Sequence, residues 1–231
     1  ESPTTIRMKK GVIFDLDGTL LDTLRDLSDS GNAVLEAHGF PTHSIDAYRT
    51  FIGTGMANLV RDIFPEGHRP SGEGEIDALL AEYREAYGRN WKNTTVPFPG
   101  IAELLTTLKA KGIPMGVVSN KAHDFTLMCV DAFLSDWTWD AVLGTREGVE
   151  KKPDPAGAIE AASLLGVAVE DCYFIGDSDV DIFTAVNAGM HPVGVRWGFR
   201  PVEELREAGA ETILETPADL LALLGGFHGC T

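Results

Sequence analysis

Residues 11–18 of the chain read Gly-Val-Ile-Phe-Asp-Leu-Asp-Gly, a short apolar run that ends in two acids and a glycine. A continuous apolar run that stops at a turn signal is typical of a strand buried on both faces of a parallel sheet. Side chains alternate along a strand, so Asp15 and Asp17 are expected on the same face. The stretch therefore predicts a buried strand that presents two carboxylates at its carboxyl end.

Further apolar runs alternate with amphipathic patterns along the rest of the chain. The runs cover residues 114–119, 141–144, 172–176 and 191–196. Residues 101–111 have apolar side chains at helical spacing, and a helix over 155–165 is predicted with Asp154 as N-cap and Pro155 in its first turn. This alternation predicts an α/β fold, a mainly parallel sheet flanked by helices.

Residues 22–96 interrupt the alternation. They contain helical patterns at 22–38, 56–64 and 76–91, a Pro/Gly-rich loop at 65–74, and no convincing strand. We therefore expect an α-helical insert after the first strand. The predicted α/β core comprises residues 8–21 and 97–231, and residues 1–7 form a tail.

The composition is that of a globular protein, with 44% hydrophobic and 23% charged residues. The net charge of −16 should repel nucleic-acid backbones and anionic membranes, so neither is expected as a partner. No apolar run reaches the ~20 residues of a membrane helix, and the first ten residues lack the apolar stretch of a signal peptide. Three cysteines without a CxxC spacing predict no disulfide framework or zinc site, which favours a cytoplasmic location.

Polar residues follow several of the predicted strands, at the sheet edge where open parallel sheets bind ligands. Besides the two acids of the first strand, they are Ser119, Asn120, Lys151, Lys152, Asp177, Asp179 and Asp181. Asp15, Asp17 and Asp177 would repel one another at one edge without a cation, and oxygen-only ligands suit Mg²⁺. Each short pattern also has an ordinary explanation as a turn, a helix cap or a solvated lysine pair. The ordered set favours a functional interpretation with bound Mg²⁺.

Four segments occur in order through the predicted core: Asp15-Leu-Asp-Gly-Thr-Leu20, Ser119-Asn-Lys121, Lys152-Pro-Asp-Pro155 and Gly176-Asp-Ser-Asp-Val-Asp181. Together they resemble the motifs of the haloacid dehalogenase (HAD) superfamily of phosphohydrolases. Phe51-Ile-Gly-Thr-Gly-Met56 and Gly194-Val-Arg-Trp-Gly-Phe-Arg-Pro201 are similar to its phosphoglycolate phosphatase group. The resemblance implies a Rossmann-like core and makes residues 22–96 a helical cap that closes over the site and sets specificity.

The resemblance also implies catalytic roles. Asp15 would be the nucleophile that forms an aspartyl-phosphate, and Asp17 would be the general acid and base. Mg²⁺ would be held by Asp15, the backbone carbonyl of Asp17 and Asp177. Lys152 would neutralise the transferring phosphoryl group and restrain Asp15, with Lys151 as a less favoured alternative.

Other motif residues would support these groups. Ser119 and the backbone of Asn120 would hydrogen-bond the phosphoryl group, and Gly18 and Thr19 would also contribute to substrate binding. Asp181, with Ser178, would orient water molecules around the metal. These two residues are the remaining site residues that the resemblance implies.

The implied activity is hydrolysis of a small phosphorylated metabolite, with phosphoglycolate favoured. A sugar-phosphate mutase and an inorganic pyrophosphatase remain alternatives, whereas a 2-haloacid dehalogenase is disfavoured because a halide leaving group does not need the acid Asp17. From another class, a phospho-receiver domain also carries an aspartate at a strand end, but it lacks a helical insert and a second acid two residues later. Monomer and homodimer both remain open.

Overall fold

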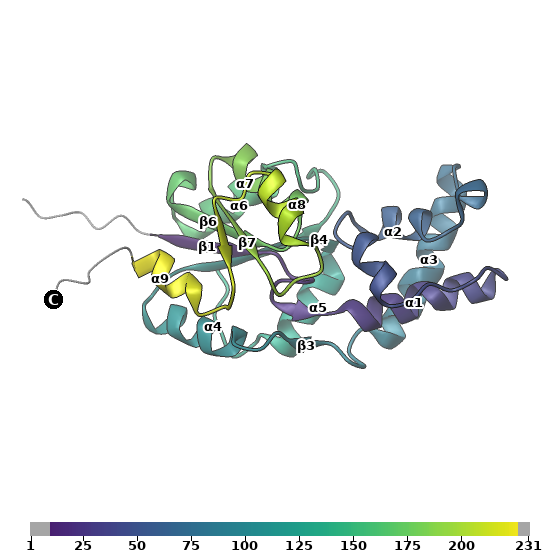
Figure 1. Cartoon of the computed structure of the whole chain (residues 1–231), viewed down its shortest axis with the longest axis horizontal. Coiled ribbons are helices and arrows are strands. Elements are labelled where there is room, and N and C mark those ends of the chain that lie inside the picture. The colour runs from purple at the N-terminus through teal and green to yellow at the C-terminus, as the bar shows by residue number, and fades with distance from the viewer. Residues whose placement is uncertain (1–9, 226–231) are drawn as a thin grey trace, which may run out of the picture.

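The computed structural model of the chain describes residues 10–225; the predicted tail at residues 1–7 and Cys230 lie outside them. Figure 1 shows two parts along the longest axis of the molecule, one built around a sheet and the other made of helices. We call residues 22–96, which supply the second part, the helical insert. The predicted division of the chain into core and cap domains at these positions stays a prediction.

Within the described residues, the strands of the first part form a six-stranded sheet in the order β5-β4-β1-β6-β7-β8, with every pairing parallel. The strands are β1 (Gly11–Phe14), β4 (Met115–Ala122), β5 (Ala141–Thr145), β6 (Cys172–Gly176), β7 (His191–Val195) and β8 (Thr212–Leu214). β1 lies between β4 and β6, as Val12 pairs with both Met115 and Tyr173. The predicted parallel α/β fold is confirmed, and the carboxyl ends of the three strands that carry acids and polar motif residues meet at one edge.

Helices cover both faces of this sheet (Figure 1). They are α4 (Ile101–Ala110), α5 (His123–Phe133), α6 (Ala156–Leu165), α7 (Asp179–Ala188), α8 (Val202–Glu207) and α9 (Asp219–Gly225). Val12 and Phe14 belong to the apolar cluster that contains α4, α5 and α9, whereas Ile13 packs with α6 and α7 on the opposite face. Burial on both faces explains why β1 is continuously apolar.

The start of α6 differs from the prediction by one residue. The helix begins at Ala156, and Pro155 occupies the N-cap position that we assigned to Asp154. The carboxylate of Asp154 nevertheless accepts the N–H of Ala156 at 2.9 Å. Asp154 therefore caps a free N–H of the first turn of α6 from the position before the N-cap.

The helical insert consists of α1 (Leu24–Ala37), α2 (Met56–Asp62) and α3 (Glu73–Asn90), with short 3-10 turns at Asp46–Thr50 and Glu66–His68. The three helices share one apolar cluster, which also includes the buried rings of Tyr48, Tyr83 and Tyr87. Nowhere in residues 10–225 is a helix both long enough and apolar enough to cross a bilayer.

The expectation that the insert contains no strand is wrong at its two ends. β2 (Leu21–Asp22) and β3 (Val96–Pro97) form an antiparallel pair where the chain leaves the sheet and returns to it. Each strand has two residues, which is too short for a pattern of apolar alternation to appear. The pair brings the two crossing segments side by side.

Candidate active site

The acids that follow β1 lie in a loop rather than on the strand. β1 ends at Phe14, and the carbonyl of Leu16 accepts the N–H groups of Thr19, Leu20 and Leu21 at 3.0–3.3 Å. The chain therefore turns immediately after Asp15, and the expectation that Asp15 and Asp17 extend the strand is wrong, although both side chains line the same pocket. The two carboxylates have different partners.

Asp15 contacts Lys152 and, through it, Asp181. The Nζ atom of Lys152 lies 2.9 Å from Oδ1 of Asp15 and 2.6 Å from Oδ1 of Asp181, and all three side chains are buried. Burial alone lowers the pKa of Lys152, but the two carboxylates outweigh it and raise that pKa above its ordinary value. Lys151 instead donates to the carbonyl of Thr54, in the helical insert, at 2.8 Å.

Asp177 completes a buried group of acids at the edge of the sheet. One carboxylate oxygen from each of Asp15, Asp177 and Asp181 lies within 4.8 Å of the other two. Burial, followed by repulsion from Asp181, raises the pKa of Asp15 to about 7 even though Lys152 opposes the shift. Burial, followed by repulsion from Asp181 and Asp15, raises the pKa of Asp177 well above its ordinary value. The group thus carries more negative charge than Lys152 compensates.

Both carboxylate oxygens of Asp181 accept hydrogen bonds from other groups of the protein. Its Oδ2 atom accepts the N–H of Asp177 at 3.2 Å, and the N–H and hydroxyl of Ser178 at 3.1 and 2.8 Å, which forms a capping box at the start of α7. Its Oδ1 atom accepts from Lys152. Asp181 therefore fixes the turn that carries Asp177 and holds the lysine in place.

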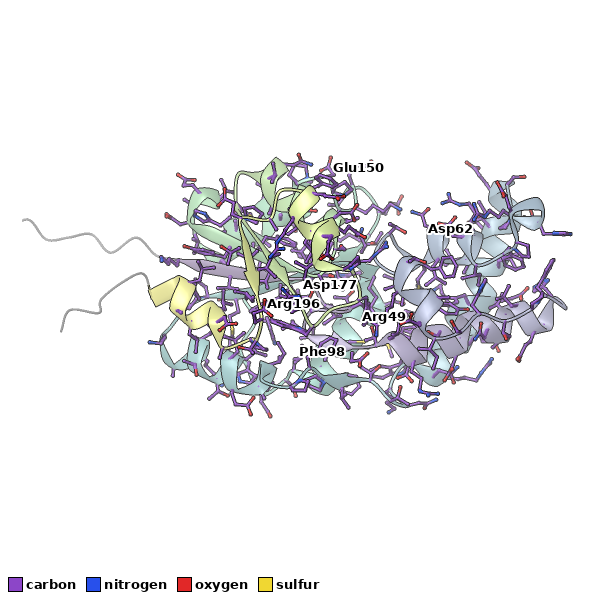
Figure 2. The ribbon with its side chains drawn as sticks, in the orientation of Figure 1. Arg49, Asp62, Phe98, Glu150, Asp177 and Arg196 are labelled. Atoms are coloured by element: carbon purple, nitrogen blue, oxygen red, sulfur yellow. The ribbon has the colours of Figure 1, made fainter. Side chains whose placement is uncertain are left out.

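Asp15 and Asp177 are better suited to bind a cation. Among residues 10–225, Oδ2 of Asp15 accepts no hydrogen bond, and Asp177 accepts the N–H of Phe199 at 2.7 Å and a long contact of 3.4 Å from the hydroxyl of Thr19. Uncompensated, buried carboxylate oxygens with few partners fit a hard divalent cation such as Mg²⁺. Figure 2 shows Asp177 where the sheet faces the helical insert, with Arg49 of the insert nearby.

Gly18 and Thr19 pack directly against this group. Gly18 has a φ of +85°, and a Cβ atom there would lie 2.2 Å from Oδ2 of Asp177. Both the left-handed backbone and the lack of a side chain are therefore required for the loop to approach Asp177. Thr19 is fully buried beside it.

Asp17 faces a different lysine. Its Oδ1 and Oδ2 atoms lie 2.9 and 3.1 Å from Nζ of Lys121, and Oδ1 also accepts the hydroxyl of Thr23 at 2.7 Å. The ammonium of Lys121 lies 4.6 Å from the centre of the Tyr87 ring, on α3. Burial lowers the pKa of Lys121, but the facing Asp17 carboxylate and Tyr87 raise it above its ordinary value. The Asp17 side chain is not part of the acid group around Asp177.

The segment Ser119–Lys121 lies within β4 rather than after it. The register between β4 and β5 shifts between Val118 and Ala122, and such irregularities redirect side chains. The side chain of Asn120 donates to the carbonyls of Gly53 and Lys152 at 3.0 and 2.9 Å and accepts the N–H of Lys152 at 2.9 Å. The hydroxyl of Ser119 accepts the N–H of Lys121 at 3.1 Å.

A pocket that is open to solvent, of about 410 Å³ with its open mouth included, lies between this edge of the sheet and the helical insert. The sheet contributes its polar wall: Asp15, Asp17, Ser119, Asn120 and Lys121. The insert contributes a mainly apolar wall: Leu27, Ile52, Gly53, Gly55, Met56, Leu59 and Tyr83. A ligand in this pocket would contact Asp15 on one side and apolar side chains on the other.

Comparison with known proteins identifies the fold family. Residues 12–195 match the family model of the haloacid dehalogenase-like hydrolases. The chain belongs to this family. Two curated relatives of this haloacid dehalogenase-like hydrolase are phosphoglycolate phosphatase 1 of Pseudomonas aeruginosa, 31% identical over 93% of this chain and 79% of the relative, and the phosphoglycolate phosphatase of Thiobacillus denitrificans, 33% identical over 85% and 88%.

A solved structure agrees with these relatives. It is a Lactobacillus delbrueckii subsp. bulgaricus protein, provisionally named phosphoglycolate phosphatase, with a TM-score of 0.85, 32% identity, and coverage of 95% of this chain and 100% of that one. The predicted family and the resemblance to the phosphoglycolate phosphatase group are confirmed. The predicted enzyme class, a phosphoric monoester hydrolase, is confirmed with them.

Two features of this haloacid dehalogenase-like hydrolase escaped the sequence analysis. Lys121 stood in a quoted motif without a role, although a lysine two residues after a buried apolar run was a signal that it has a buried partner. The second feature is Asp26 on α1. It is fully buried and accepts hydrogen bonds from Thr94 and Thr95, just before β3, and nothing local in the sequence indicates this contact.

Proposed function

We propose that the chain is a Mg²⁺-dependent phosphatase that hydrolyses phosphoglycolate through an aspartyl-phosphate on Asp15. The observation that carries this proposal is the setting of Asp15, whose Oδ1 is held by Lys152, whose Oδ2 accepts no hydrogen bond within residues 10–225, and whose carboxylate has an oxygen within 4.8 Å of one of Asp177. A carboxylate that a lysine holds in place is oriented for attack on phosphorus. Its neighbours are suited to bind a metal and a phosphoryl group.

In the first step, one oxygen of the Asp15 carboxylate forms a bond to phosphorus while the bond from phosphorus to the ester oxygen breaks. In the second step, water attacks the same phosphorus, releases inorganic phosphate and restores the carboxylate. Lys152 keeps Asp15 oriented in both steps, and Ser119 lies in the same pocket to hydrogen-bond the transferring group. Two easier displacements replace one difficult one.

Mg²⁺ would be held by the side chains of Asp15 and Asp177 and by the backbone carbonyl of Asp17. When bound, it would neutralise charge on the phosphoryl oxygens. The protein prepares this site by burying the carboxylates together, and Asp181 fixes the turn that presents Asp177. Burial, and after it repulsion from the neighbouring acids, raises the pKa values of Asp15 and Asp177, and a bound cation would offset that repulsion.

Asp17 is the proposed acid and base, protonating the leaving oxygen and then deprotonating the attacking water. Its carboxylate is bound to Lys121 and Thr23, so this role requires it to leave those partners. It lines the same pocket as Asp15, which supports this proposed role.

The relatives named above and the walls of the pocket both support phosphoglycolate as the substrate. Leu27, Ile52 and Leu59 give the insert's wall few hydrogen-bonding groups, whereas a sugar phosphate would bring several hydroxyl groups to it. Phosphoglycolate has no hydroxyl groups to place against this wall, and its single carboxylate can face the polar wall instead, so it matches the pocket better than the substrate of a sugar-phosphate mutase. We further propose that the enzyme acts in the cytoplasm on a free metabolite, without nucleic acid or a membrane as partner.

Phosphate release from a panel of substrates tests the proposal. With Mg²⁺ present, kcat/KM for phosphoglycolate should exceed the values for glucose 6-phosphate, pyrophosphate and para-nitrophenyl phosphate by at least ~10-fold, the discrimination that one well-matched polar contact gives. If another phosphate ester of the panel had a higher kcat/KM than phosphoglycolate, the substrate assignment would be overturned. Absence of phosphate release from every ester would overturn the phosphatase itself.

A further inference from the structure

Lys121 is a buried cation in the pocket wall. Its side chain is 2% exposed at the end of β4, and its ammonium lies between the Asp17 carboxylate and the Tyr87 ring of the helical insert. Among the pocket-lining residues of the described chain, it is the only one that carries a positive charge. A negatively charged group on the organic end of a substrate therefore has one cationic partner in this wall.

The rest of the pocket makes that partner necessary. The opposite wall is formed by apolar side chains such as Leu27, Ile52 and Leu59. A carboxylate placed there loses water and gains nothing in return, which costs several kcal/mol unless a cation compensates for it. A neutral tail of the same size meets no such cost. Contact with Lys121 would thus distinguish phosphate esters that carry a carboxylate from phosphate esters whose organic end is uncharged.

Lys121 already has a carboxylate partner. Both oxygens of Asp17 lie within 3.1 Å of its ammonium, and the remaining side of the ammonium faces the Tyr87 ring. An ammonium has three N–H donors, and two contacts to Asp17 and one side facing the Tyr87 ring occupy them, so a second carboxylate must replace one of these contacts. Two adjacent carboxylates in a buried pocket would also repel each other. Exchange of one carboxylate for the other avoids both costs.

We propose that Lys121 binds the carboxylate of the substrate and thereby displaces Asp17, which is freed to act on the ester oxygen. The inference rests on the proposed function, because it takes the substrate to be a small phosphorylated carboxylic acid. It makes Lys121 a specificity residue and makes the release of Asp17 dependent on the correct substrate. A substrate without a carboxylate leaves Asp17 bound to Lys121 and Thr23.

Two phosphonates that cannot be hydrolysed separate binding from catalysis. 3-Phosphonopropionate has the shape of phosphoglycolate, and propylphosphonate has the same chain without the carboxylate. Calorimetric titration with Mg²⁺ gives a dissociation constant for each, and their ratio isolates the carboxylate. The wild-type protein should favour 3-phosphonopropionate by about 10- to 100-fold, the range of a charged hydrogen bond.

Lys121→Met should reduce this ratio to about one, because methionine keeps the apolar stem and removes the charge. Lys151→Met is the matched control, since Lys151 bonds the carbonyl of Thr54 and is not itself among the residues that line the pocket, and its ratio should stay within about 3-fold of wild type. If melting shows that Lys121→Met does not fold, Lys121→Gln takes its place. An unchanged ratio in the folded Lys121 variant would overturn the inference.

Asp17→Asn tests the exchange itself. If Asp17 competes with the ligand for Lys121, a neutral amide should compete less, so 3-phosphonopropionate should bind about 10-fold tighter to the variant while propylphosphonate binds as before. Equal or weaker binding of 3-phosphonopropionate would overturn the displacement. Phosphate release by the wild-type enzyme is measured separately, so failure of the proposed function appears as lack of phosphoglycolate turnover, whichever way the binding ratios fall.

Discussion

Replacement of Asp26 by asparagine tests how the helical insert is tied to the sheet. The Asp26 carboxylate is fully buried and accepts hydrogen bonds from the backbone N–H and the hydroxyl of both Thr94 and Thr95, at 2.7–3.0 Å. α1 follows β2 closely, and the two threonines directly precede β3. One side chain therefore joins the two segments through which the chain crosses between the sheet and the insert.

The expected cost follows from the number of donors. Asparagine keeps the shape of the side chain, but its NH₂ group cannot accept, so the donors that face one oxygen lose their acceptor and meet another donor. Each hydrogen bond to a charged group contributes about 1.5–3 kcal/mol, and disruption of a buried charged network costs about 3–5 kcal/mol. Since one oxygen of the pair remains, we expect Asp26→Asn to lower the free energy of unfolding by about 3 kcal/mol.

Urea unfolding followed by tryptophan fluorescence measures this change. Asp29→Asn is the matched control, because Asp29 is an exposed acid on the same helix, and its effect should stay within about 0.5 kcal/mol. If Asp26→Asn differed from Asp29→Asn by less than about 1 kcal/mol, the hydrogen bonds to the threonines would not be stabilising the fold as we infer.

Removal of the metal with EDTA should abolish phosphate release; Mg²⁺ should restore it, and Ca²⁺ should not, because it takes more ligands at longer distances. Full activity in EDTA would exclude the metal site. Burial raises the pKa of Asp15 to about 7, above its ordinary 3.8. Between these two pH values the folded metal-free protein keeps a proton that the unfolded chain loses. The stability of the metal-free protein should therefore fall as the pH rises from about 4 to about 7. Because the cation needs ionised carboxylates, the rise in melting temperature that Mg²⁺ causes should be larger at about pH 8 than at about pH 5.5, and the opposite trend would contradict the proposed ligands. Lys152→Met should lower kcat by at least ~100-fold, because it removes the contact with Asp15, whereas Lys151→Met should lower kcat by less than ~3-fold. Equal losses of kcat in the two variants would show that the contact between Lys152 and Asp15 does not contribute to catalysis.

The sequence predicted those strands and helices that depend mainly on residues within the element itself. β6 begins and ends where its apolar run does, at residues 172–176, since a strand buried between two neighbours must be continuously apolar. The loop after Phe14 was missed because three N–H groups converge on the carbonyl of Leu16, and alternation of residue types does not report such a turn. Strands of two residues, β2 and β3, are too short for any period to appear.

The parts of the site that depend on distant contacts could not be predicted in the same way. Lys121 and Asp17 are 104 residues apart, and their pairing depends on the position of β1 beside β4 and on the irregular register of β4. Asp26 lies on a helix where an acid usually faces solvent, and its partners are 68 and 69 residues away. The family motifs identified the acids near the sheet edge, whereas these two contacts required the packing of the insert against the sheet.

The position of the phosphoryl group on the enzyme tests the central claim most directly. Asp17→Asn keeps the nucleophile but removes the group that should activate the attacking water, an effect of about 10²–10⁴-fold. Para-nitrophenyl phosphate needs no proton on its leaving group, so this variant should release a burst of nitrophenol and accumulate phosphoenzyme. Peptide mass spectrometry after acid quenching should locate the phosphoryl group on Asp15, and Asp15→Asn should give neither burst nor phosphoenzyme. A phosphoryl group on another residue, or normal turnover by Asp15→Asn, would contradict the account.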